Sequence, residues 1–324
     1  MRTAWLQVRM GLTVLLLFAV IYALLAVVAT VAGVDTPLVY AVLALGLVAV
    51  QFLIGPKIVE LTMRIRYVSE AEQPELHRIV SDLALKAGIP KPRVGISEIQ
   101  IPNAFAFGTT KRNARVCVTR RLLEMLNRNE LEAVLGHELS HIKHRDMVVI
   151  TALSVIPMIC YVIYFSFFWS GLLGGGRSRE GTLPAMAIAL LAFVIYFISN
   201  LIVLYASRIR EYYADAGSAE LTQKPHELAS ALYKMVYGSA RPGTEKITKE
   251  LGSMRAFFAA DPMTARGDIK DLSAADLNRD GKIDAYELKM FAERAKVGRA
   301  ERLMELFSTH PNPVVRVKRL GTYL

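Results

Sequence analysis

The stretch NELEAVLGHELSHIKHRD, residues 129–146, decides how the rest of this chain is interpreted. Its apolar residues recur at the three- and four-residue spacing of an amphipathic helix: Leu131, Val134, Leu135, Leu139 and Ile142. We expect Asn129 to cap this helix at its N-terminus, with Glu132 three residues on as the reciprocal partner. The sequence therefore predicts one helix through the whole stretch.

Two histidines of this helix form an H-E-x-x-H arrangement with a glutamate between them. His137 and His141 are four residues apart, so their side chains leave one helix face, and Glu138 lies beside them. Two neutral imidazoles bind Zn²⁺, while an adjacent carboxylate accepts a proton from the attacking water. A surface helix could carry this spacing by chance, but three of the chain's six histidines fall within the eight residues 137–144. The stretch therefore indicates a zinc site.

The composition of the chain is that of a membrane protein. Hydrophobic residues make up 53% of the sequence and charged residues only 21%. Apolar runs long enough to cross a bilayer lie at about 11–33, 36–55, 147–173 and 183–206. We therefore expect a mainly α-helical fold with a small β-sheet, four transmembrane helices and the lipid bilayer as a partner.

The net charge of +10 is explained by basic residues around the apolar runs. They gather at the ends of the runs, as Arg2, Arg9, Lys57, Arg64, Arg66, Lys143, Arg145, Arg208 and Arg210. This distribution is typical of the cytoplasmic ends of membrane helices, so we expect no nucleic-acid partner. The two cysteines, Cys117 and Cys160, indicate no disulfide framework and fit a reducing cytoplasm.

The segment before the zinc helix is expected to form a small sheet. Residues 74–88 have the pattern of an amphipathic helix, and residues 93–101 and 114–119 alternate as strands do. Between the strands lies IPNAFAFG, residues 101–108, followed by a polar turn. Such a hairpin could bind an extended peptide as an added strand, or it could be an ordinary part of the core. The pattern alone favours neither.

A second charged segment, SRIREYYADAGSAEL (207–221), follows the fourth apolar run. Glu211 and Asp215 are four residues apart and share a helix face. Glu211 can be a third zinc ligand, and Asp215 can accept a hydrogen bond from a ligating imidazole. The alternative is a charged turn next to the membrane. If Glu211 is a ligand, it must lie on the same side of the membrane as the histidines, so the chain must cross the membrane an even number of times between residues 146 and 207. Alternatively, the two apolar runs could form a helical hairpin buried in the protein.

Four segments together resemble the HtpX-type membrane zinc endopeptidases of the M48 family. They are NAFAFG (103–108), HELSHIKHRD (137–146), SRIREYYAD (207–215) and FSTHPNPVVRVKRL (307–320). The resemblance covers nearly the whole chain in the right order. It implies a zincin-like catalytic domain on the cytoplasmic side of the cell membrane, with misfolded or damaged membrane proteins as polypeptide substrates.

The resemblance also assigns residues and divides the chain. It implies one Zn²⁺ per chain, held by His137, His141 and Glu211, with Glu138 as general base, His310 as an oxyanion donor, and Asn103, Ala104, Phe105 and Ala106 as the substrate-binding edge. The expected parts are two transmembrane helices (1–56), the first catalytic part (57–146), two further transmembrane helices (147–206) and the second catalytic part (207–324).

One inserted segment, about 265–300, departs from the family pattern and contains DLNRDGKIDAYE, residues 276–287. It matches the 12-residue EF-hand calcium loop, with Gly281 at the sharp turn. The ligands it predicts are Asp276, Asn278, Asp280, the carbonyl of Lys282, Asp284 and Glu287. An acidic surface loop is the alternative, and the helix before the loop has little apolar face. We expect a Ca²⁺ site that modulates His310 or substrate access.

Other functions fit the sequence less well. The charged residues RNELE (128–132) and KHRD (143–146) around the histidines argue against a protease site buried inside an apolar span. A transporter would need charged residues well inside the spans, and the sequence has none. A proteolytically inactive membrane calcium sensor or scaffold stays as the main alternative, although every residue of the predicted zinc site is present.

Overall fold

The computed structural model describes residues 49–50, 53–173, 179–240, 265–295, 305–308 and 310–324. The chain divides into two compact units, one made of Ile54–Met147 with Arg210–Leu324, the other of Met1–Leu53 with Val148–Ile209. The two predicted N-terminal membrane helices lie almost wholly outside the described residues. So do residues 174–178 of the predicted loop and 296–300 of the predicted insert.

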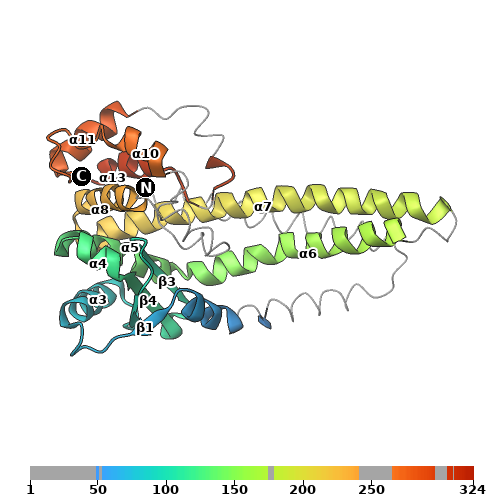
Figure 1. Cartoon of the computed structure of the whole chain (residues 1–324), viewed down its shortest axis with the longest axis horizontal. Coiled ribbons are helices and arrows are strands. Elements are labelled where there is room, and N and C mark those ends of the chain that lie inside the picture. The colour runs from blue at the N-terminus through green and yellow to red at the C-terminus, as the bar shows by residue number, and fades with distance from the viewer. Residues whose placement is uncertain (1–48, 51–52, 174–178, 241–264, 296–304, 309) are drawn as a thin grey trace. The chain divides into compact units, whose positions relative to one another are not determined.

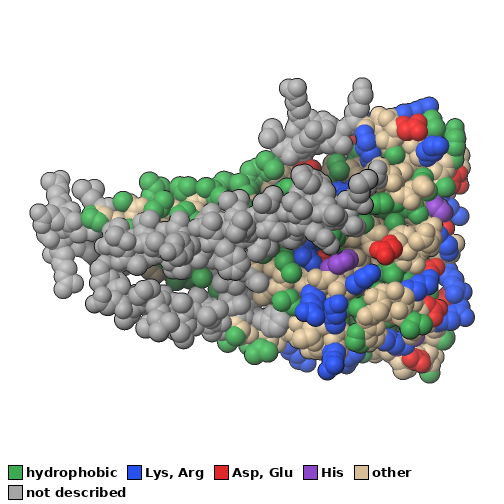
Figure 2. Space-filling view, turned by 180° about the vertical axis from the view of Figure 1, so that it is seen from behind, with side chains coloured by type: hydrophobic (Ala, Val, Ile, Leu, Met, Phe, Trp, Pro, Cys, Tyr) green, Lys and Arg blue, Asp and Glu red, His purple; other side chains and the backbone are tan. Residues whose placement is uncertain are grey.

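The third and fourth apolar runs form two long helices (Figure 1). They are α6, Asp146–Leu173, and α7, Arg179–Thr222. Within the described part of the chain, Asp146–Trp169 and Pro184–Thr222 are long and apolar enough to cross a membrane. The two helices pack on each other through Leu153, Ile156 and Ala206. Large apolar side chains such as Leu190 remain exposed, and the described surface of these helices is mostly apolar in Figure 2, as lipid contact requires.

The fourth apolar run and the charged segment after it form a single helix, which the sequence pattern did not predict. α7 continues through Glu211 and Asp215 and ends at Thr222. Neither glycine nor proline occurs between residues 185 and 216, so no residue favours a break there. A membrane-type helix therefore carries the predicted third ligand directly.

Four short strands form one mixed sheet with the order β1-β2-β4-β3. β2 and β4 are parallel, and the two outer strands pair antiparallel to their neighbours. Both predicted strands and the hairpin are confirmed, although β2 ends earlier than expected and β1 was not predicted. The strands are β1, Ile65–Tyr67; β2, Arg93–Ser97; β3, Ala104–Gly108; and β4, Ala114–Thr119.

Helices cover both faces of this sheet, because alternate strand residues point to opposite sides. On one side the sheet shares the main core with α3, Pro74–Ala87, and α5, Arg128–His144. The other face carries a second apolar cluster, in which Val59 and Met63, at the end of the helical residues 53–62, pack with Phe105, Phe107 and Cys117. The sheet is therefore a fixed support for α5.

Helix α5, which carries His137 and His141, begins earlier than predicted. Its N-cap is Asn127, whose side chain accepts a hydrogen bond from the Glu130 amide at 2.9 Å, and Glu130 accepts one from the Asn127 amide at 2.9 Å. The prediction of Asn129 with Glu132 was therefore wrong. Both asparagines have a glutamate three residues on, but Glu130 is also buried against Ser230 and Lys234 of α8, and this tertiary contact selects the earlier pair.

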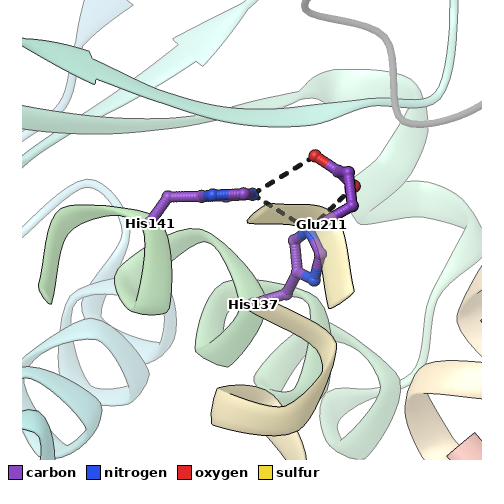
Figure 3. A group of neighbouring side chains, drawn as sticks. All are labelled: His137, His141 and Glu211. Carbon is purple, nitrogen blue, oxygen red and sulfur yellow. Dashed lines mark hydrogen bonds and ion pairs between the residues drawn. The ribbon is translucent and has the colours of Figure 1, made fainter. Parts of the chain in front are cut away.

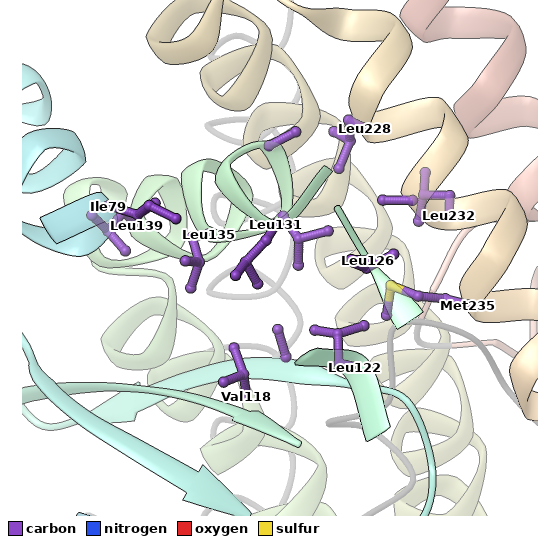
Figure 4. Packing of buried hydrophobic residues seen from close by; sticks show 14 of the residues in the cluster. Ile79, Val118, Leu122, Leu126, Leu131, Leu135, Leu139, Leu228, Leu232 and Met235 are labelled. Atoms are coloured by element: carbon purple, nitrogen blue, oxygen red, sulfur yellow. The ribbon is translucent and has the colours of Figure 1, made fainter. Parts of the chain in front are cut away.

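The remaining helices complete the unit that contains α5 (Figure 4). Apolar residues of α5 and α8 meet in the main core, including Leu131, Leu228 and Leu232. The molecule is thus mainly helical with a small mixed sheet, as predicted. The further helices are α4, Arg120–Met125; α8, Pro225–Ser239; α10, Ala265–Leu272; α11, Ala285–Arg294; and α13, Pro313–Leu320, with 3₁₀ turns at Lys111–Asn113 and Gly321–Tyr323.

Candidate metal centre

Small residues bring α7 close to α5. A Cβ atom on Gly217 would lie only 2.1 Å from Oγ of Ser140, so glycine is required at this crossing. One residue later, the Ser218 hydroxyl donates a hydrogen bond of 2.6 Å to the carbonyl of Ala133. This close approach places Glu211, two turns before the crossing, beside the two histidines of α5.

The three residues predicted as zinc ligands lie close together; they are His137, His141 and Glu211 (Figure 3). Each offers one ligand atom, and these atoms lie within 4.8 Å of one another, the one such group found among the residues that the structure describes. Nε2 of His137 lies 3.2 Å from Nε2 of His141, and each Nε2 is 3.5 Å from a Glu211 oxygen. The predicted ligands therefore share one small volume.

The chemistry of this donor set fits Zn²⁺. Two imidazole nitrogens and a carboxylate oxygen are a common catalytic zinc set. Both Nδ1 atoms already face carboxylates: His137 lies 3.0 Å from Asp215 Oδ1, and His141 lies 2.7 Å from Asp146 Oδ2. Each Nδ1–H can donate to its carboxylate, which leaves the Nε2 lone pairs directed at the shared volume.

Two arginines hold these carboxylates, and the sequence analysis missed both. Arg316 binds Asp215 through two bonds, and its Nη1 lies 3.2 Å from Glu211 Oε2. Arg210 forms an ion pair with Asp146. Asp146 was also missed as a partner of the histidines. No spacing rule identifies these residues, because their partners lie on other helices. The one available signal was that each of them lies within a segment that resembles the family.

The glutamate between the histidines lies in a nearly dry environment. Glu138 is 6% exposed, and burial raises the pKa of its carboxyl. Burial disfavours the charged form of His137, but its bonds to Asp215 and Glu211 outweigh this and raise the pKa of His137 to about 9. Burial and the neighbouring His137 lower the pKa of His141. The surroundings therefore shift the pKa values of the two histidines in opposite directions.

The C-terminal segment brings His310 to the same place. Nδ1 of His310 lies 3.4 Å from Glu211 Oε1. Its chain direction is fixed by the start of α13, where Asn312 accepts a hydrogen bond from the amide of Val314 at 2.7 Å and Pro313 occupies the first helical position. The residue predicted from the Ser-Thr-His-Pro segment is therefore next to the predicted ligand carboxylate.

The predicted substrate edge corresponds to β3, an outer strand of the sheet that contacts α5. Asn103 is buried just before this strand; its carbonyl accepts a hydrogen bond from the Thr119 amide, and its amide donates to the Thr119 hydroxyl. Ala104 and Phe105 are buried, and Ala106 is half-buried. One long edge of β3 is bonded to β4.

The predicted calcium loop, residues 276–287, follows α10 and ends in the first turn of α11. Gly281 has a φ of 82° at the turn. Asp276 accepts hydrogen bonds from the amides of Asp280 and Gly281, while Asn278 accepts one from Asp280. The Glu287 carboxylate accepts hydrogen bonds from the amides of Leu277, Asn278 and Asp284, and Asp284 caps α11. Within the part of the chain that the structure describes, the side chains of this loop do not form a group whose ligand atoms lie close enough together to hold a metal ion.

The fold and the paired histidines with their carboxylates define the class of this chain: it is a membrane metallopeptidase. Residues 70–323 match the family model of peptidase family M48. The Protease HtpX homolog of Methanothermobacter thermautotrophicus is 56% identical over 231 residues, which cover 71% of this chain and 86% of that protein. The chain belongs to peptidase family M48 and is of the HtpX type, as the sequence motifs indicated.

A further relative agrees with this assignment, and a solved structure shares the fold. The Protease HtpX homolog of Aeropyrum pernix is 36% identical over 325 residues, with 96% of each chain covered. The crystal structure of S. mikatae Ste24p matches with a TM-score of 0.53 at 16% identity, covering 98% of this chain and 67% of that one. At this identity the structural likeness concerns the fold alone.

Proposed function

We propose that this chain is a zinc-dependent endopeptidase that cleaves polypeptides at the cytoplasmic side of the cell membrane. The observation that carries the proposal is the convergence of His137 Nε2, His141 Nε2 and a Glu211 oxygen within 4.8 Å. One Zn²⁺ per chain would be held by these three groups. An inactive calcium sensor is not favoured, because the three proposed ligands lie close together and the chain is an M48 peptidase.

Bound at this site, Zn²⁺ would supply Lewis acidity toward the attacking water and the scissile carbonyl. Glu138 is proposed to accept the proton of that water and then deliver it to the nitrogen of the leaving amine. Its burial supports this role, because a carboxyl pKa raised toward neutrality suits both steps. Such proton transfer contributes about 10²–10⁴-fold to a rate.

His310 and Asp215 have supporting roles in the proposal. His310 is proposed to donate a hydrogen bond to the oxygen that becomes negative during the attack. Its position 3.4 Å from Glu211 supports this. Asp215 is proposed to hold His137 with Nε2 toward the metal, which the 3.0 Å distance between the two residues supports.

The substrate is proposed to bind as an extended strand along Asn103, Ala104, Phe105 and Ala106. The outer position of β3 and its contact with α5 support this, because an outer strand has one edge not bonded within its own sheet. We propose misfolded or damaged membrane proteins as substrates, four membrane spans and a catalytic domain facing the cytoplasm. The relatives named as HtpX proteases and the basic residues near the spans support this placement.

Calcium modulation stays a prediction. The turn at Gly281, the helix α10 before the loop and the helix α11 that begins within its last three residues support it. We expect Ca²⁺ to draw Glu287 from the backbone amides it now contacts and to change protease activity. Activity at fixed Zn²⁺, measured in EGTA and in Ca²⁺, tests this, with Glu287→Gln as the variant. Equal activity in both buffers would exclude modulation.

The proposed function is tested with full-length protein purified in detergent. Casein cleavage, self-cleavage and zinc content are measured for the wild type and Glu138→Gln. We expect one zinc per chain in both proteins and a loss of about 10²–10⁴-fold in the rate of the variant. Absence of zinc from both proteins, or equal activity in both, would contradict the proposal.

A further inference from the structure

Each predicted zinc-ligating histidine is held by a carboxylate, and each carboxylate is held by an arginine. On the first side the chain of contacts is His137, Asp215 and Arg316. On the second side it is His141, Asp146 and Arg210. All four outer residues lie within the segments that resemble the family, but the sequence analysis gave a role to Asp215 alone.

Asp146 is well placed to fix the ring of His141. It directly follows Arg145, the left-handed C-cap of α5, and is the first residue of α6. The residue is only 6% exposed, and its Oδ2 lies 2.7 Å from Nδ1 of His141. A buried carboxylate at this distance accepts the Nδ1–H, so it selects the tautomer whose Nε2 lone pair is free for a metal.

Arg210 holds Asp146 from the other side. Its Nη2 forms an ion pair with Oδ1 of Asp146 and also lies 3.1 Å from the carbonyl of His144. Arg210 is only 7% exposed as a whole residue, so its buried charge needs the partner. Arg210 directly precedes Glu211, so one turn of α7 supplies both a predicted metal ligand and the residue that orients another ligand's carboxylate.

We propose that Asp146 is a positioning residue of the metal centre that acts through His141, and that Arg210 positions Asp146. This inference rests on the proposed zinc site.

Zinc affinity of the full-length protein, measured by competition with a chromogenic chelator, tests this inference without any activity assay. Asp146→Asn preserves the shape of the side chain but removes its charge. We expect zinc affinity to fall by about 10–100-fold, and to fall less with Arg210→Gln, which leaves the carboxylate in place. Asp82→Asn, an exposed aspartate of α3, is the matched control and should bind zinc as the wild type does.

A second variant addresses folding. The double variant Asp146→Asn with Arg210→Gln removes both charges, so no unpaired buried charge remains. It should fold and still bind zinc as weakly as Asp146→Asn. Binding as tight as that of the wild type, in either the single or the double variant, would overturn the inference. No zinc binding in the wild type itself would instead overturn the proposed function.

A spectroscopic measurement distinguishes a role of Asp146 in orienting His141 from a general effect on the stability of the protein. In the cobalt-loaded protein, the Nδ1–H of each ligating histidine gives a paramagnetically shifted, solvent-exchangeable proton signal. Two such signals are expected in the wild type. Asp146→Asn should remove one or make it exchange faster, while the signal of His137 persists. Loss of both signals together, or retention of both unchanged, would contradict a role through His141.

Discussion

Arg316 binds the carboxylate of Asp215 through two bonds, 3.0 Å from Nε to Oδ2 and 2.7 Å from Nη2 to Oδ1. Both side chains are almost fully buried. Burial opposes the charge of the guanidinium, but Asp215 and Glu211 hold the pKa of Arg316 above its ordinary value. Because Asp215 also contacts His137, the pair joins α13 to the metal centre.

Substitution of Arg316 should destabilise the fold. Arg316→Gln leaves the buried carboxylates of Asp215 and Glu211 without their cation, so we expect the free energy of unfolding to fall by about 3–5 kcal/mol. Chemical unfolding followed by circular dichroism measures this. Arg120→Gln is the control, because Arg120 binds Glu98 with the same two-bond geometry at the surface. It should change little, and an equal loss in both variants would contradict the account.

The position of the α5 cap gives a second prediction. Asn127→Ala removes the acceptor for the Glu130 amide, so we expect a loss of about 1 kcal/mol in the free energy of unfolding. Asn129→Ala is the matched control, because Asn129 lies inside the helix and contacts Lys224 at the surface. Its effect should be below about 0.5 kcal/mol. A larger loss for Asn129→Ala than for Asn127→Ala would contradict this prediction and support Asn129 as the N-cap.

Local patterns predicted the elements that carry the site. The H-E-x-x-H spacing placed His137 and His141 on one helix face, and the spacing of four placed Glu211 and Asp215 together. Apolar periodicity likewise predicted α3, β2 and β4. These features depend on residues close together in the chain, which is why one sequence sufficed for them.

Features that depend on tertiary contact were missed. Asn127 and Asn129 have equivalent local patterns, and only the burial of Glu130 against α8 decides between them. Asp146 and Arg210 are 64 residues apart in the sequence, and Asp215 and Arg316 are 101 apart. No local rule pairs such residues. β1 has only three residues and was too short to show a pattern.

Zinc binding should release a proton at neutral pH. In the metal-free chain the pKa of His137 is raised to about 9, so this histidine is protonated at pH 7 and must lose its proton to bind a metal. We therefore expect about one proton released per zinc, and an affinity that rises about tenfold per pH unit until pH reaches about 9. Calorimetry in buffers of different ionisation enthalpy measures the release. An apparent enthalpy independent of the buffer would contradict this prediction.

Metal removal should lower stability together with activity. Treatment with a zinc chelator is expected to abolish cleavage and lower the unfolding midpoint, and added Zn²⁺ should restore both. At a free zinc concentration 100 times the Kd, binding contributes about 2.7 kcal/mol to the free energy of unfolding. His141→Ala should show almost no zinc-dependent shift. A zinc-dependent shift of wild-type size in that variant would place the metal elsewhere.

The most direct test of the central claim is the zinc content of purified full-length protein, measured by mass spectrometry for single substitutions within the site. The control is His144→Ala, because His144 lies on the same helix but outside the ligand group. We predict one zinc per chain in the wild type and in His144→Ala, and almost none in His137→Ala, His141→Ala or Glu211→Ala. Zinc at one per chain in all of these variants would contradict the assigned metal centre.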